Sequence, residues 1–100
     1  MPILNDIKTA LRISINNTAF DSEITDLIAA ARGDLMLAGI LPAKANDDND
    51  PLIKRAIVVY CKANFGYDNS EAERFQQSYD MLKAHLTLSL EYTAVSDGET

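Results

Sequence analysis

The chain has 100 residues, of which 47% are hydrophobic and 24% charged, and its formal net charge at pH 7 is −6. This length fits one small domain with a modest core, for which oligomerisation is a common source of further stability. The negative charge argues against a general affinity for DNA, because binding to phosphates requires a concentration of Lys and Arg. Cys61 is the single cysteine, which excludes a disulfide within the chain and a cysteine-based zinc site.

Targeting signals are not visible in the sequence. The first residues, Met1 to Asp6, lack the basic start and the long apolar run of a signal peptide. No apolar run approaches the about 20 residues that a membrane-spanning helix needs. Cys61 lies in an apolar segment with helical spacing, which is the usual setting of a buried thiol in a reducing compartment. We therefore expect a cytosolic chain that makes no membrane contact.

Hydrophobic spacing predicts an all-α fold, a small bundle of about four helices. The expected helices span residues 4–13, 20–40, 51–65 and 71–90. They form a single domain over residues 1–92. Residues 93–100 have nothing to bury and are expected to form a flexible tail.

The first two helices lie on either side of a segment rich in Ser and Asn, residues 14–17, whose side chains compete for backbone hydrogen bonds. Thr18 or Asp21 is expected to cap the second helix through a side-chain oxygen. Gly39 and Pro42 are expected to close it. An apolar stripe about 100° wide directs this helix to the core. The stripe consists of Ile24, Leu27, Ile28, Ala31, Leu35 and Ala38.

Residues 42–50 are polar and rich in turn-forming side chains, so they are predicted to form a mobile loop. Asp47, Asp48 and Asp50 give the segment a loose likeness to a cation-binding loop. It lacks the central Gly and the terminal Glu that an EF-hand requires. We therefore interpret it as a solvated acidic loop and expect no metal ion there.

The sequence predicts both ends of the third helix. Asp50 can cap its first free N–H groups, and Pro51 fits the first turn, where its missing N–H is not needed. Gly66 suits the left-handed position that follows a helix. Apolar residues cover about two-thirds of its circumference, so we expect a central helix surrounded by the others. These residues are Leu52, Ile53, Ala56, Ile57, Val59, Tyr60, Cys61 and Ala63.

Lys54, Arg55 and Lys62 occupy the only polar strip of the third helix, within about 100°. One interpretation is a solvated edge, or an edge that pairs with acidic residues of the second helix. The other is a candidate basic strip for contact with an acidic partner surface or with the DNA backbone. Three charges would give only weak, salt-sensitive contact with DNA.

Ser70 and Glu73 form a capping box that predicts the start of the fourth helix. Its core-facing residues lie within about 80° on a helical projection. They are Phe75, Tyr79, Leu82, Leu86 and Leu90. Apolar and polar residues alternate from Leu86 to Tyr92, which leaves a short strand near the end as an alternative to the helix.

A second apolar face of the fourth helix lies about 140° from the first. It carries Met81, Leu88 and Tyr92. The first helix or the end of the chain could cover this face within the monomer. The alternative is a candidate subunit interface, because clustered exposed apolar residues on a small protein usually mark a contact. Met36 and Leu37 lie off the main stripe of the second helix and join this candidate interface.

No catalytic site is indicated. His85 is the single histidine, and Cys61 lies in the middle of an apolar helix rather than at a helix start, where a thiolate would be stabilised. A packed thiol and a surface or interface histidine explain both residues. The glycines are scattered along the chain, so no glycine-rich phosphate loop is present. We expect neither enzymatic activity nor a cofactor.

The order of segments resembles that of a known family. A short first helix is followed by Asp-Ser-Glu-Ile-Thr-Asp-Leu-Ile-Ala-Ala-Ala-Arg at 21–32, an acidic loop, Asp-Pro-Leu-Ile-Lys-Arg-Ala-Ile at 50–57 and a last helix over 75–92. This order is similar to that of the tailed-phage head–tail connectors, also called DNA-packaging or head-completion adaptors, over residues 3–92. The run 78–90 resembles versions from phages and prophages of Gram-positive bacteria.

The resemblance implies a non-enzymatic structural adaptor of the virion, present in the host cytoplasm during assembly. Such an adaptor forms a ring below the portal, joins the head to the tail and retains packaged DNA. The implied partners are further copies of the chain, the portal protein, and the next connector or tail-completion protein, with transient non-specific contact with DNA. A dodecamer is one candidate ring size, and the ring could form only on the portal. The family loop between the second and third helices corresponds here to residues 42–50.

A small helical DNA-binding or regulatory protein, similar to a terminase small subunit or a repressor, is the alternative function. A recognition helix would expose several Arg, Lys, Asn or Gln side chains toward the major groove. The third helix is too apolar for this role, and the other helices are too acidic.

Overall fold

The computed structural model describes residues 3–66 and 70–93, and within these ranges the chain is helical with no strand. The helices are α1 (Ile3–Ala10), α2 (Asp21–Leu37), α3 (Pro42–Ala45), α4 (Pro51–Asn64), α5 (Ala72–Thr87) and α6 (Leu90–Thr93). The all-α bundle is therefore confirmed, and the four longer helices overlap the four predicted ones. The two short helices, α3 and α6, were not predicted.

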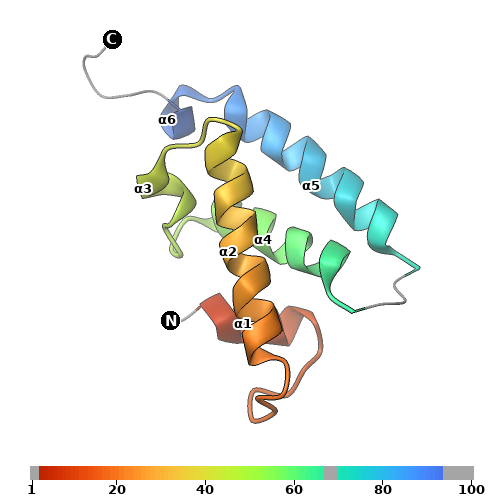
Figure 1. The fold of residues 1–100 in the computed structure, drawn as a ribbon. Helices are drawn as coiled ribbons and strands as arrows, with labels where there is room; N and C mark the ends of the chain where they lie inside the picture. The colour runs from red at the N-terminus through yellow and green to blue at the C-terminus, as the bar shows by residue number, and fades with distance from the viewer. Residues whose placement is uncertain (1–2, 67–69, 94–100) are drawn as a thin grey trace.

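Helix α4 is the central helix, as its broad apolar surface predicted. It packs against α5, α2 and α1 (Figure 1). Asp50 caps its start, where Oδ1 accepts hydrogen bonds from the backbone N–H groups of Leu52 at 2.9 Å and Ile53 at 3.2 Å. Pro51 occupies the first turn. Gly66 follows its end with a φ of 86°, a left-handed value that favours glycine.

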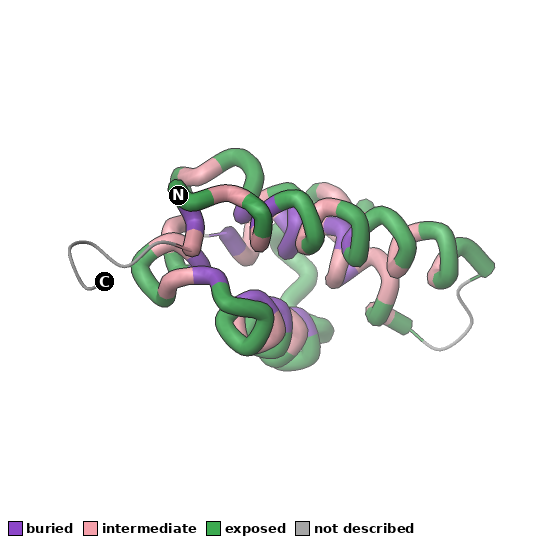
Figure 2. The backbone as a smooth tube through the Cα atoms, turned by 90° about the horizontal axis from the view of Figure 1, so that it is seen from above, coloured by how far each residue is buried: buried purple, intermediate pink, exposed green. Residues whose placement is uncertain are grey.

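The core lies where these helices face one another, and Figure 2 shows the buried positions along their inward sides. Most of the predicted α2 stripe is buried; Leu27 is half-buried and Ala38 is exposed. The rings of Tyr60 and Tyr79 meet edge to face with centroids 5.1 Å apart, which joins α4 to α5. The buried apolar residues are Ile3, Ile7, Ile24, Ile28, Ala31, Leu35, Ile40, Ala45, Ile53, Ala56, Ile57, Val59, Cys61, Tyr79, Leu86 and Tyr92.

Helix α1 ends at Ala10, three residues before the predicted boundary. Arg12 has a φ of 64°, and the N–H of Ile13 donates to the carbonyl of Lys8 at 2.8 Å. Helices commonly end at a residue with a left-handed φ, next to a backbone hydrogen bond that spans six residues. The left-handed residue is here an arginine rather than a glycine, which is why the sequence pattern did not reveal the end of this helix.

The predicted caps of α2 and α5 are wrong. Phe20 precedes α2 without a side-chain hydrogen bond, so neither Thr18 nor Asp21 caps it. Asp21 forms an ion pair with Lys8 instead. Glu71 precedes α5, likewise without a side-chain cap, so the capping box of Ser70 and Glu73 does not form.

The segment 42–50 is more ordered than the predicted mobile loop, since it begins with α3 and buries Ala45. Arg32 of α2 holds it in place. One guanidinium nitrogen donates to the carbonyl of Ala45 at 2.9 Å, and the other donates to Asp48 Oδ1 at 2.5 Å. Asp48 is thus the partner of an arginine, not part of a free acidic cluster.

Helix α5 ends at Thr87, and α6 follows instead of the alternative strand. The N–H of Leu41 donates to the carbonyl of Tyr92 at 2.8 Å, and the Tyr92 hydroxyl donates to Asp50 Oδ1 at 3.1 Å. Thr93 belongs to α6, so the predicted tail cannot begin there. The remainder of that prediction, residues 94–100, lies outside the described residues.

Candidate interaction surfaces

Large apolar side chains are exposed on the outer side of α5 and at the end of α2. Met81 is 63% exposed and Leu88 is 82% exposed, so the second face of the fourth helix does not meet the monomer's core. Leu37 is 90% exposed, and its neighbour Met36 is exposed to a lesser degree. The structure thus leaves uncovered four of the five side chains of the candidate interface. We call Met36, Leu37, Met81 and Leu88 the apolar surface.

Tyr92, the fifth residue of the candidate interface, does not lie on the exposed face where it was expected. Its side chain is buried among core residues, and its hydroxyl is bound to Asp50. Leu90 shows the opposite change, since it was expected in the core and is exposed. Both follow from the end of α5 at Thr87, because a single long helix would have given these residues other directions.

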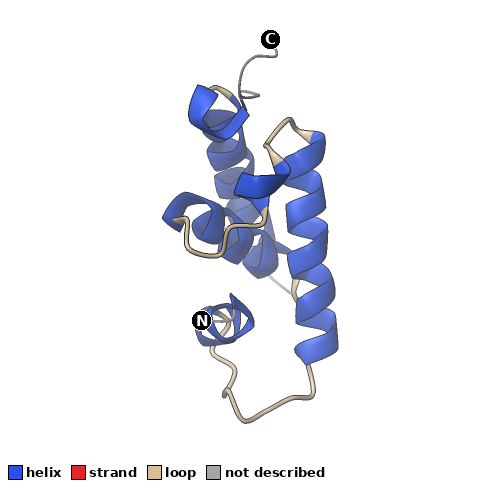
Figure 3. Ribbon diagram, turned by 90° about the vertical axis from the view of Figure 1, so that its left-hand side faces the viewer, coloured by secondary structure: helices blue, strands red, loops and turns tan. Residues whose placement is uncertain are grey.

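The C-terminal ends of α2 and α5 lie with α6 at one end of the molecule (Figures 1 and 3). Leu37 and Leu88 therefore belong to the same end. Asp34 connects the two helices one turn before Leu37, because its Oδ2 accepts hydrogen bonds from Tyr79 Oη at 2.6 Å and Lys83 Nζ at 2.9 Å. This end exposes apolar side chains beside the hydrogen-bonded contact between α2 and α5, which suits it to contact with another protein.

The predicted basic strip is divided among different partners. Lys54 pairs with Asp6 of α1 at 3.1 Å, not with acidic residues of α2. Lys62 lies over the ring of Phe75 with 5.3 Å between Nζ and the centroid. Arg55 is exposed. The three residues therefore have different surroundings.

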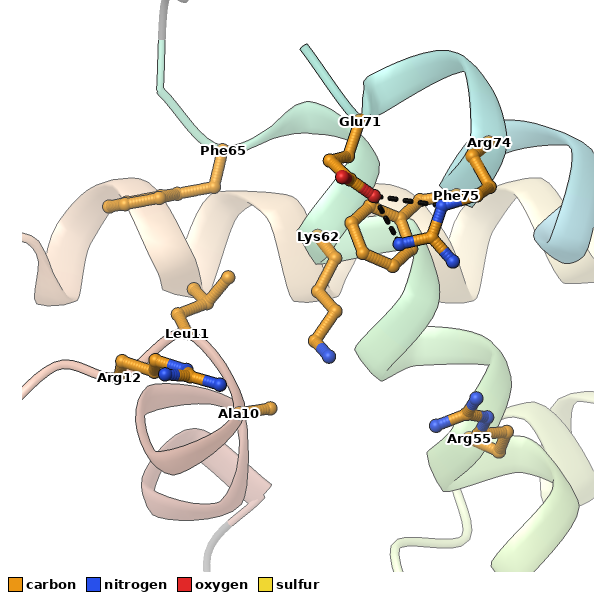
Figure 4. A pocket seen from close by; sticks show the side chains of 9 residues that line it. All are labelled: Ala10, Leu11, Arg12, Arg55, Lys62, Phe65, Glu71, Arg74 and Phe75. Atoms are coloured by element: carbon orange, nitrogen blue, oxygen red, sulfur yellow. Dashed lines mark hydrogen bonds and ion pairs between the residues drawn. The ribbon is translucent and has the colours of Figure 1, made fainter. Parts of the chain in front are cut away.

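Arg55 and Lys62 instead contribute to a groove formed by α1, α4 and the start of α5. Its volume is about 600 Å³, and Figure 4 shows the side chains around it. They are Ala10, Leu11, Arg12, Arg55, Lys62, Phe65, Glu71, Arg74 and Phe75. Glu71 accepts hydrogen bonds from the Arg74 guanidinium. We call this feature the basic groove.

Two of the cations in the basic groove, Arg12 and Arg74, were not identified from the sequence. They lie far from the third helix along the chain, on the turn after α1 and on α5. No local pattern connects them to Arg55. Only the packing of α1 and α5 on either side of α4 brings them together.

Cys61 and His85 are the two residues that were considered for chemistry. Cys61 is fully buried in α4, and burial raises the pKa of its thiol to about 12. His85 is exposed on α5. Over residues 3–66 and 70–93, no three His, Cys, Asp or Glu side chains gather in a way that could hold a metal ion. No helix in these ranges is both long and apolar enough to cross a membrane.

The helical bundle thus carries two candidate interaction surfaces, the apolar surface and the basic groove. A family model described as phage connector protein matches residues 3–93. The chain belongs to this family, so the resemblance of its segments to the phage connectors is confirmed. No curated protein and no solved structure matches the chain. Its role is that of a structural connector of the phage particle.

Proposed function

We propose that the protein is a non-enzymatic adaptor that assembles as a ring below the portal, joins the head to the tail and retains packaged DNA. Its partners are further copies of itself, the portal protein and the next connector or tail-completion protein. It is made in the host cytoplasm and becomes part of the virion. The family match supports the connector role and favours it over the alternative of a DNA-binding regulator.

The observation that carries the assembly proposal is the apolar surface. Burial of a Leu or Met side chain contributes about 1.5–3 kcal/mol, and Leu37, Met81 and Leu88 gain little of this in the isolated chain. A partner that covers them supplies this free energy against the entropic cost of association. Met36, Leu37 and Met81 lie on α2 and α5, and Leu88 directly follows the end of α5.

The test is the double variant Met81→Asp and Leu88→Asp, studied by multi-angle light scattering alone and after mixing with the portal. We expect the wild-type protein to add to the portal as a ring and the variant to remain free. Ile15→Asp is a matched control, because Ile15 is 53% exposed but lies in the turn between α1 and α2. Normal ring formation by the double variant would overturn the assignment of this surface.

A further inference from the structure

The basic groove concentrates positive charge on an acidic chain. The chain has nine Lys and Arg residues against fifteen Asp and Glu residues. Four of those nine cations, Arg12, Arg55, Lys62 and Arg74, line this one groove. Copies of a chain with net charge −6 repel one another. Close self-association is therefore favoured where a positive surface of one copy meets a negative surface of another.

Arg12 and Arg55 are the cations of the groove that are available to pair with a carboxylate of another molecule. Both are exposed, and among the described residues neither guanidinium has a carboxylate partner. Phe65 and Phe75 add apolar walls to the groove. A hollow with both apolar walls and cations suits an acidic protein segment better than the backbone of a DNA duplex, which presents phosphates without apolar side chains.

An outward stripe of α2 has the complementary character. Its residues lie within about 80° of one another and about 150° from the buried stripe of the same helix. They are Glu23, Asp26, Ala30, Gly33 and Leu37. Glu23 and Asp26 are exposed, and in the described part of the chain no Lys or Arg pairs with either of them. We call these five residues the acidic stripe after Glu23 and Asp26; the other three carry no charge.

Gly33 gives an independent reason to place a neighbour on this stripe. A Cβ atom built at Gly33 meets nothing within 4 Å, so packing within the chain does not require a glycine there. Glycine in the middle of a helix destabilises it relative to alanine. A second helix or loop that approaches the stripe closely would explain why a side chain is absent at this position.

We propose that the acidic stripe of one copy docks into the basic groove of the next copy, with Glu23 and Asp26 facing Arg12 and Arg55. This inference rests on the proposed ring and names its subunit contact. The groove is built by α1, α4 and α5, whereas the stripe lies on α2, so the two surfaces are different parts of the chain. A contact between two different surfaces is head-to-tail, which is the arrangement that generates a ring.

The test uses two charge-reversed variants, one for each surface. The groove variant carries Arg12→Glu and Arg55→Glu, and the stripe variant carries Glu23→Arg and Asp26→Arg. We expect each variant alone to assemble on the portal about tenfold less well or worse, because like charges then face each other. A one-to-one mixture should restore assembly, since each reversed surface then meets its complement. Light scattering measures the assembly, and circular dichroism verifies the fold.

Two further variants sharpen the result. Glu73→Arg with Asp80→Arg makes the same change in net charge as the stripe variant, at exposed positions outside both surfaces, and should assemble normally. Gly33→Leu tests the same contact without a change of charge. The variant should unfold at a temperature no lower than that of the wild-type protein. It should assemble about tenfold less well or worse, because the added side chain occupies the space that the neighbour needs.

The possible failures can be told apart. If the apolar double variant loses portal binding while both charge-reversed variants assemble normally, this contact is wrong and the proposed function stands. If only the groove variant fails, and what it loses is the retention of packaged DNA, then the groove binds DNA. That result also overturns the proposed contact. If the wild-type protein never binds the portal, the proposed function fails, and this inference fails with it.

Discussion

Tyr79 of α5 donates a hydrogen bond of 2.6 Å to Asp34 Oδ2 on α2, across 45 residues of sequence. Lys83 donates to the same oxygen at 2.9 Å. The tyrosine hydrogen bond lowers the pKa of Asp34, burial opposes that change, and Lys83 lowers it further. Burial and the neighbouring Asp34 carboxylate raise the pKa of Tyr79. This polar contact joins α2 and α5, which both pack against α4.

Tyr79→Phe tests this contact through the pH dependence of stability. Because the folded pKa of Asp34 is lowered, the unfolded chain binds more protons in acid. The stabilisation is therefore present above the unfolded pKa of about 3.9 and is lost as the pH falls through the folded pKa. We expect the variant to lose about 1–2 kcal/mol at pH 7 and to show a weaker dependence on pH between about 5 and 3. Urea unfolding at several pH values measures both effects. An unchanged acid profile would show that Tyr79 does not control Asp34.

Lys8 and Asp21 form an unequal pair. Lys8 Nζ lies 2.8 Å from Asp21 Oδ1, and the side chains are 2% and 31% exposed. Lys8 also donates to the carbonyl of Ile15 at 3.0 Å, whereas Oδ1 of Asp21 is buried and has no well-aligned hydrogen bond among the described residues. The pair closes the turn between α1 and α2. The stability lost when the pair is broken therefore depends on which partner is removed.

We expect Asp21→Ala to lower the free energy of unfolding by about 3 kcal/mol, because it leaves a buried ammonium group without its counter-charge. Lys8→Met should cost only about 1 kcal/mol, since the methionine side chain still fills the site and the Asp21 side chain is 31% exposed, which allows its carboxylate some contact with water. Chemical denaturation of the two variants compares them directly. A larger loss for Lys8→Met would contradict this ranking.

Asp50 links the start of α4 to α6, since its Oδ1 accepts from two backbone N–H groups and from the Tyr92 hydroxyl. Asp50→Ala should cost about 1–2 kcal/mol through the lost cap. Tyr92→Phe should cost about 1 kcal/mol through the lost hydrogen bond. The double variant should lose less unfolding free energy than the sum of the two single losses. Once Asp50 is replaced, the Tyr92 hydroxyl no longer has that partner, so its removal costs less. Full additivity in urea unfolding would mean that the two residues do not interact.

Cys61 should be protected from thiol reagents. It is fully buried, and burial raises its pKa to about 12, so that the reactive thiolate is scarce at neutral pH. We expect labelling by Ellman's reagent to be slow in the folded protein and fast in urea. The labelling rate should rise with any of the destabilising substitutions above, because it follows the population of opened chains. Rapid labelling of the native protein would show an exposed thiol.

The sequence by itself determined the central helix and the inward stripes. Asp50, Pro51 and Gly66 define the ends of α4 through local backbone requirements, and the spacing of Ile24, Ile28 and Leu35 defines the buried side of α2. These features depend on residues within a few positions of one another, so a linear pattern contains them. The same periodicity placed Met81 and Leu88 on a second face of the last helix, but only the folded structure shows that this face is uncovered.

Only the tertiary structure decided the features that join distant segments. The burial of Tyr92 depends on where α5 stops and on the Asp50 carboxylate 42 positions away. The order of segment 42–50 depends on Arg32, and the basic groove depends on Arg12 and Arg74 meeting at α4. Side-chain hydrogen bonds and charge clusters form between residues that packing brings together, and helical spacing along one segment does not reveal which residues those are.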